Sequence, residues 1–254
     1  MAGRARRTRA FEEVLLQVER RIADDGLRVG DRLPGERQLA EQLQVSRASV
    51  REALRVLETL GVVSSQAGRG PDAGAILTSR PDSALTDLLR LSLGLSSLSL
   101  REVIDTRLMI ERWSAEHAAR GATTQARIDA MAAARPGATT ELRPDAVAEA
   151  RPGAMAEAIR AMEAAATAEE FVEHDIAFHV AIAEASGNRL VAAVMRALRD
   201  AMRRYAIEAV ERLGDTGVLR EDHRRIHDAI TSGDAAAAID AVTAHLAHAY
   251  PELF

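Results

Sequence analysis

Histidine provides the most chemically suggestive pattern in this 254-residue chain, which contains seven histidines and no cysteine. All but one of the histidines follow position 170, and three pairs of residues have spacings that place both members on one face of a helix. These pairs are Asp175 with His179, His223 with His227, and His245 with His248. A carboxylate and imidazoles from three facing helices can bind one divalent metal in the core of a helical bundle. Three histidines and an aspartate suit zinc, nickel, manganese or iron.

The alternative interpretation is that these histidines lie on the solvated faces of arginine-rich amphipathic helices. The spacing by itself leaves both interpretations open. The absence of cysteine excludes disulfides, thiolate metal sites and cysteine nucleophiles.

A second pattern consists of arginine and short hydroxyl side chains in the first eighty residues. The candidates at the start of one helix are Ser46, Arg47, Ser49 and Arg51. Arginine can bind guanine through two hydrogen bonds and can also pair with phosphate. Arg37 lies at the start of the preceding helix, and Arg69 with Gly70 lies in a glycine-rich segment whose backbone can approach a minor groove closely. The alternative is that the arginines of this helix form an ordinary solvated face.

Composition predicts a mostly helical chain. Aromatic residues make up only 3%, and all 33 basic residues are arginine, against 38 acidic residues. Residues 1–80 have a net charge of +3 and the remainder −8, which suggests two units with different partners. No apolar stretch reaches the ~18 residues that a membrane span needs, and the basic N-terminus lacks the apolar region of a secretory signal. We therefore expect a cytoplasmic protein that does not bind membranes.

The first eighty residues predict a winged helix-turn-helix. Apolar periodicity indicates a helix over 11–22, a second helix from Glu36 and a third helix that begins after Ser46 as its N-cap and stops at Gly61. Two β-rich runs, 62–66 and 75–78, surround a glycine-rich tip. In such a fold the second helix of the pair inserts its N-terminal residues into the major groove of DNA.

The rest of the chain, residues 84–250, predicts an all-α bundle. A polar joint at 79–83 marks the boundary, and the sequence Ser99-x-x-Glu102 and its counterpart at 167–170 form capping boxes. The expected helices run from 99 to about 120, from 167 to 186, from 188 to 213, from 218 to 232 and from 235 to 249. Pro-Gly pairs predict an inserted mobile loop at 135–153.

The run from Gly30 to Gly70 resembles the DNA-binding domain of the GntR family of bacterial regulators. The resemblance rests on Leu33-Pro34, Glu36-Arg37, Val45-Ser46-Arg47, Val50-Arg51, Gly61 and Gly68-Arg69-Gly70. It implies that Arg37, Arg47 and Arg51 contact operator DNA and that Gly68 or Gly70 lies at the minor groove. The wing tip, PDAGA, departs from the usual family pattern.

Residues 85–250 resemble the FCD ligand-binding domain of the FadR subgroup of the same family. The matching segments are HDIAFHVAIAEASGN, EDHRRIHDAITSGD and AVTAHLAHAY. The resemblance implies metal ligation by Asp175, His179, His223 and His245, with His174, His227 and His248 as bystanders or supporting groups. It also implies that Arg107, in an Arg-x-x-x-Glu signature with Glu111, and Asn188 face the effector.

These observations predict a transcriptional regulator rather than an enzyme. The expected protein is a homodimeric repressor that binds a pseudo-palindromic operator in double-stranded DNA. A small organic acid would bind at the divalent metal, most simply zinc, beside Arg107. The alternatives are a metal-dependent enzyme and a sensor of the metal itself.

Overall fold

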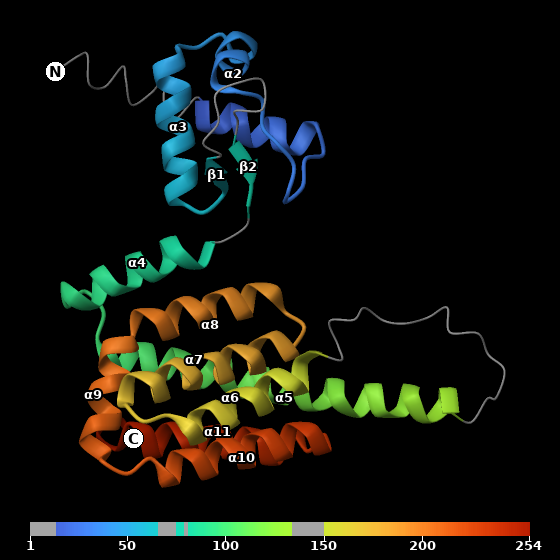
Figure 1. Ribbon diagram of the computed structural model, residues 1–254, viewed down its shortest axis with the longest axis vertical. Coiled ribbons are helices and arrows are strands. Elements are labelled where there is room, and N and C mark those ends of the chain that lie inside the picture. Colours follow the sequence, from blue (N-terminus) through green and yellow to red (C-terminus); the bar gives the residue numbers. More distant parts are fainter. Residues whose placement is uncertain (1–13, 66–74, 79–80, 134–149) are drawn as a thin grey trace. The chain divides into compact units, whose positions relative to one another are not determined.

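The computed structural model describes residues 14–65, 75–78, 81–133 and 150–254, and the chain divides into two compact units, Met1–Leu85 and Thr86–Phe254 (Figure 1). Each unit has its own apolar core. The expected fold class, a winged helix-turn-helix followed by an all-α bundle, is confirmed.

The first unit is a helix-turn-helix with a short antiparallel hairpin. A helix over 14–24 precedes α2 (Glu36–Leu43), α3 (Arg47–Thr59), β1 (Val63–Ser65) and β2 (Ala75–Leu77). The turn between α2 and α3 is tight because Gln44 adopts a left-handed conformation, and the Ser46 hydroxyl caps α3 by accepting a hydrogen bond from the Ser49 amide. Apolar residues from all these elements pack together, with Val50 and Ala53 of α3 completely buried. This packing fixes the outward direction of the polar face of α3.

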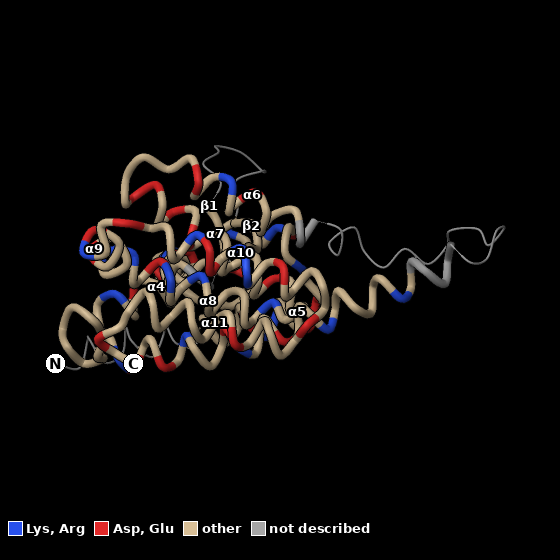
Figure 2. The backbone as a smooth tube through the Cα atoms, turned by 90° about the horizontal axis from the view of Figure 1, so that it is seen from below, with Lys and Arg blue, Asp and Glu red and all other residues tan. Residues whose placement is uncertain are grey.

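Beyond the hairpin the described residues form helices, some of which carry the seven histidines. They are α4 (Pro81–Gly94), α5 (Leu100–Ala133), α6 (Ala150–Ala164), α7 (Ala168–Ala185), α8 (Arg189–Ala201), α9 (Arg203–Leu213), α10 (Gly217–Ser232) and α11 (Ala235–Ala249), followed by a 3-10 turn at Pro251–Leu253. Helix α5 packs against α7, α10 and α11, so these four helices enclose the interior of the bundle (Figure 1). Charged residues of both signs are interspersed along the helices (Figure 2), and pairs such as Arg120 with Glu116 stabilise their exposed faces.

Several expected boundaries were wrong. Helix α4 begins at Pro81, inside the expected joint, because proline fits the first position of a helix. Helix α5 continues past Arg120 to Ala133. The single helix expected over 188–213 is in fact two helices, which meet at the buried residue Met202. No glycine or proline lies next to Met202, so the sequence contains no local signal of a helix end there.

The expected loop at 135–153 also ends earlier than its Pro-Gly pair suggested. Helix α6 begins at Ala150, so Pro152 and Gly153 belong to its first turn, where proline costs no intrahelical hydrogen bond. The remainder of that loop, 134–149, lies outside the described residues.

Replacing Gly233 should destabilise the bundle. Gly233 ends α10 with φ +77°, and an added Cβ would lie 2.1 Å from the Thr123 hydroxyl oxygen on α5. Gly233→Ala is expected to lower the free energy of unfolding by about 1–2 kcal/mol, because an L-residue is strained in this conformation. The matched control is Gly121→Ala within α5, where a Cβ meets nothing within 4 Å and should raise stability by up to ~1 kcal/mol. Urea unfolding of the two variants measures the difference, and a Gly233→Ala variant as stable as wild type would contradict this account.

Candidate functional site

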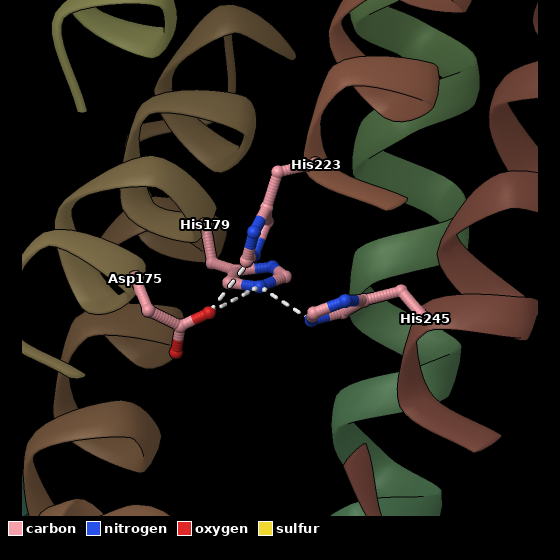
Figure 3. A group of neighbouring side chains, drawn as sticks. All are labelled: Asp175, His179, His223 and His245. Atoms are coloured by element: carbon pink, nitrogen blue, oxygen red, sulfur yellow. Dashed lines mark hydrogen bonds and ion pairs between the residues drawn. The ribbon is translucent and has the colours of Figure 1, made fainter. Parts of the chain in front are cut away.

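Four buried side chains from three helices converge in the interior of the bundle (Figure 3). Asp175 and His179 come from α7, His223 from α10 and His245 from α11. Each offers one ligand atom, and these four atoms all lie within 4.8 Å of one another. We call this group the Asp/His cluster. The structure therefore brings together the four residues that the family resemblance selected.

The donor atoms of the Asp/His cluster face one another directly. His223 Nε2 lies 3.0 Å from Asp175 Oδ1, and His179 Nε2 lies 3.3 Å from the same oxygen. His179 Nε2 is also 3.2 Å from His245 Nε2 (Figure 3). Three imidazole nitrogens and one carboxylate oxygen thus point toward a common centre.

Burial keeps two of the imidazoles, those of His223 and His245, in the form that a metal requires. Desolvation, together with the neighbouring His179 and Arg199, holds the pKa of His223 well below its usual range. Desolvation and the neighbouring His223 and His179 lower the pKa of His245 in the same way. A neutral imidazole presents a lone pair, whereas an imidazolium does not, so these residues fit a divalent cation with nitrogen and oxygen ligands.

The bystander histidines lie away from this centre. His227 is only partly buried, and its Nδ1 lies 3.1 Å from the exposed Asp228. His248 is half-exposed and contacts the buried Asp222 at 2.7 Å. His174 is partly buried on α7 and is not a member of the Asp/His cluster. In each of the two pairs that contain two histidines, one histidine therefore faces the interior and the other faces outward.

Two buried arginines and a second carboxylate surround the Asp/His cluster. Arg199 of α8 forms an ion pair with Asp175 Oδ2, on the side of the carboxylate away from the imidazoles. Arg107 of α5 donates from Nε to Glu111 Oε1 at 2.9 Å, and the other oxygen of Glu111 lies 2.8 Å from His179 Nδ1. Burial opposes the charge of Glu111, but His179 and Arg107 outweigh it and hold the pKa of its carboxyl well below the usual value.

A small cavity lies beside this network. Its volume is about 20 Å³, enough for one or two water molecules. Its polar wall includes Arg107, Arg199 and Tyr250, and its apolar wall is formed mainly by α9. We call it the two-arginine cavity. Burial and the nearby Arg107 lower the pKa of Arg199 to about 9, so both guanidinium groups are charged at neutral pH.

The two expected effector contacts occupy different environments. Arg107 is completely buried and lines the two-arginine cavity. Asn188 is exposed, and its side chain caps α8 by accepting hydrogen bonds from the Leu190 and Val191 amides. The structure thus gives Asn188 a structural role outside the cavity, and its effector contact remains only a prediction from sequence.

Sequence reasoning missed Arg199 and Asp222. Arg199 lies one helical turn from Met195 and from Met202, and all three are buried. A single arginine within an apolar helical stripe was the available signal, because a charge on such a face must have a buried partner. Asp222, buried between His248 and the Asp/His cluster, gave no comparable signal.

The residues that the sequence predicts to read DNA lie at the start of α3. Arg47 is exposed, and the Ser46 and Ser49 hydroxyl oxygens lie 2.8 Å apart. Arg51 pairs with Glu36 of α2 at 3.0 Å. Arg37 is exposed at the start of α2, whereas the wing residues Arg69 and Gly70 lie outside the described residues.

Comparison with known proteins gives the family. The FCD domain matches residues 102–248, and the gntR family of bacterial regulatory proteins matches residues 11–71. The chain belongs to the GntR family of DNA-binding transcriptional regulators and carries an FCD domain. No helix among the described residues combines the length and apolar character that crossing a membrane requires.

Its relatives are named as transcriptional regulators, several of them after the operon that they regulate. A regulatory protein of Escherichia coli K12 named for the L-lactate dehydrogenase operon is 30% identical over 94% of this chain and 84% of its own. LutR of Bacillus subtilis is 29% identical over 89% of this chain and 92% of its own. The Glc operon transcriptional activator of E. coli K12 is 27% identical over 86% and 79%. A solved GntR structure from Streptococcus agalactiae shares the fold, with a TM-score of 0.61 at 22% identity over 95% of this chain and 99% of its own.

Truncating Arg47 should weaken binding to specific DNA. Arg47→Ala is expected to cost about 1–3 kcal/mol of operator affinity if this side chain reads a base. The control is Arg55→Ala, which removes the same charge from the same helix two turns later. Gel-shift titrations on a fragment selected by the wild-type protein from random DNA compare the variants. Equal losses for Arg47 and Arg55 would favour a general solvated face over a recognition role.

Lowering the pH should destabilise the metal-free protein. Because the pKa values of His223 and His245 are depressed, the unfolded state binds more protons than the native state below about pH 6.5. The contribution of these two imidazoles to the free energy of unfolding is fully present above that pH. It is lost as the pH falls, by up to about 1.4 kcal/mol per pH unit for each imidazole. Urea unfolding in chelator between about pH 7.5 and about pH 5 measures this slope. His245→Gln should make it shallower and His227→Gln should leave it unchanged; an unaltered slope in His245→Gln would count against the assignment.

Proposed function

We propose that this regulator is a homodimeric repressor whose binding to a pseudo-palindromic operator is controlled by a small organic acid at a divalent metal site. The observation that carries the proposal is the position of the Asp/His cluster beside a cavity with two buried arginines. A cation site and guanidinium groups side by side form a receptor for a carboxylate.

The metal would be held by Asp175, His179, His223 and His245. Zinc is the first candidate, and nickel, manganese and iron also suit these ligands. When bound, the ion supplies a Lewis acid that attracts a carboxylate oxygen. The protein contributes neutral imidazoles and a carboxylate already directed at one centre.

The arginines would orient the acid. Arg107 Nη1 is buried without a hydrogen-bond partner among the described residues, and Arg199 Nε is in the same condition. A carboxylate in the cavity would satisfy such donors, because buried polar groups gain most from a charged partner. L-lactate, which appears in the name of the E. coli relative, is a small carboxylate of this class and is the first compound to test.

The cavity is smaller than the acid, which supports a conformational mechanism. A volume of about 20 Å³ does not admit a hydroxy acid unless its walls move. An effector that binds only the opened form shifts the population toward it, and a coupling of about 1–3 kcal/mol is typical of such regulators. A dimer would transmit the change to two DNA-reading helices on a two-fold symmetric operator.

Removing one cluster histidine should remove the metal. His223→Ala is expected to abolish stoichiometric metal in the purified protein, because this side chain points into the cluster. The control is His227→Ala, one helical turn away on the same helix, which should retain the metal. Elemental analysis of wild type and both variants measures the content, and equal metal in all three would reject the site.

Gel-shift titrations distinguish the modes of control. Operator release on addition of L-lactate to the metal-loaded protein, abolished by chelator, is the expected result. Tighter DNA binding on addition of the acid would contradict the proposed release of the operator by the effector. A response to metal without any acid would indicate a metal sensor, and consumption of the acid would indicate an enzyme.

A further inference from the structure

Arg107, Glu111 and His179 form a continuous buried chain from the two-arginine cavity to the Asp/His cluster. Arg107 Nε and Nη2 each lie 2.9 Å from Glu111 Oε1. Glu111 Oε2 lies 2.8 Å from His179 Nδ1. None of the three side chains exposes more than 2% of its surface. One carboxylate thus contacts an arginine of the cavity with one oxygen and a cluster histidine with the other.

The local fold fixes this chain. Arg107 and Glu111 are four residues apart on α5, so they lie on one helical face, and α7 with His179 packs against α5. Glu111 Oε2 and His179 Nδ1 lie 2.8 Å apart as an ion pair, and neither atom forms a hydrogen bond among the described residues. The ion-pair contact is therefore the interaction that the described residues give to both atoms.

We propose that Glu111 is a positioning residue that holds the proton of His179 on Nδ1 and makes metal affinity depend on an anion at Arg107. This inference deepens the function proposed above and its second half rests on that function. Glu111 touches neither the cluster centre nor the acid. It acts through His179 on one side and through Arg107 on the other.

The first half follows from the chemistry of a neutral imidazole. A metal-bound imidazole carries one proton, and a carboxylate beside Nδ1 holds that proton on Nδ1. The lone pair then resides on Nε2, the atom that faces Asp175 and His245. A carboxylate that contacts the far nitrogen of a metal-bound histidine strengthens the bond of that histidine to the cation.

The other two cluster imidazoles have no equivalent support among the described residues. His245 Nδ1 is 3.9 Å from Asp222, beyond hydrogen-bond range. In the described part of the chain, His223 Nδ1 has no hydrogen-bond partner and, unlike His179 Nδ1, no ion pair with a carboxylate. Among carboxylates that are not themselves members of the Asp/His cluster, Glu111 is therefore the one whose loss should weaken metal binding most.

The second half follows from the sharing of Glu111. Arg107 engages Glu111 Oε1 and also lines the cavity. An anion in the cavity attracts the guanidinium and weakens its hold on the carboxylate. The negative charge of Glu111 is then more available to His179, which becomes a better ligand. Because binding linkage is reciprocal, the metal raises the affinity for the anion by the same factor.

The first experiment measures Co²⁺ affinity of the full chain by competition with a chelator. Glu111→Gln is expected to lower the affinity about 10- to 100-fold, the usual effect of losing a carboxylate behind a metal-bound histidine. The control is Asp228→Asn, which neutralises an exposed carboxylate that contacts the outward-facing His227 at 3.1 Å. That variant should bind Co²⁺ as wild type does. Wild-type affinity in Glu111→Gln overturns the proposal.

A second arm uses acetate as the anion. Acetate should raise Co²⁺ affinity several-fold more in wild type than in Glu111→Gln or Arg107→Met, although any direct contact between acetate and metal persists in all three. The same enhancement in all three proteins overturns the coupling. Since Glu111→Gln leaves Arg107 buried without its partner, the double variant Arg107→Met/Glu111→Gln serves if the single variant does not fold. The double variant should bind Co²⁺ more weakly than wild type, and a wild-type Co²⁺ affinity in the double variant overturns the proposal.

A third readout needs no metal. Nitrogen-15 spectra of histidine-labelled protein in chelator report which ring nitrogen of His179 carries the proton. We expect Nδ1 in wild type and a mixture in the double variant. A wild-type proton on Nε2 overturns the proposal. A proton on Nδ1 in a wild type that binds no Co²⁺ rejects the metal site while supporting the proton-holding role of Glu111.

Discussion

The carboxylate of Asp175 joins the two parts of the buried polar site. One of its oxygens faces His179 and His223, and the other pairs with Arg199. Each partner needs this charge, because a buried arginine without an anion and a cluster of imidazoles without a carboxylate are both costly in a low-dielectric interior. The packing of α7 against α8 and the side-chain contact from α7 to α10 are therefore tied to the chemistry of the site.

The charges of this interior are nearly balanced by two ion pairs. Arg107 is matched by Glu111, and Arg199 by Asp175, while burial favours neutral His223 and His245. A divalent cation added to this set brings two positive charges into a region where unpaired charge is strongly unfavourable. An incoming acid anion compensates part of that charge. This balance gives a physical reason for a metal and a carboxylate to bind together.

Sequence patterns predicted those parts of the molecule that local rules control. Ser46 was recognised as an N-cap, Gly233 as a helix stop, and the reciprocal Ser99 and Glu102 box opens α5 as expected. The break at Met202 was missed because tertiary packing rather than local sequence sets it.

The candidate site also combines features that local sequence predicts with features that only tertiary packing determines. Helical spacing alone did not distinguish His223 from His227, because the two histidines are one helical turn apart and lie on the same face of the helix. The choice came from the family resemblance, and the structure places His223 inside the bundle and His227 toward the surface. Arg199 was missed because its partner, Asp175, lies 24 positions away on another helix.

The tightness of the two-arginine cavity bears on the speed of the response. A ligand that fits only after the wall formed by α9 has moved must wait for that movement, both to enter and to leave. The lifetime of the bound complex would then be set by how often the bundle opens and not by diffusion. Such a regulator would respond to sustained changes in metabolite concentration and average over brief fluctuations.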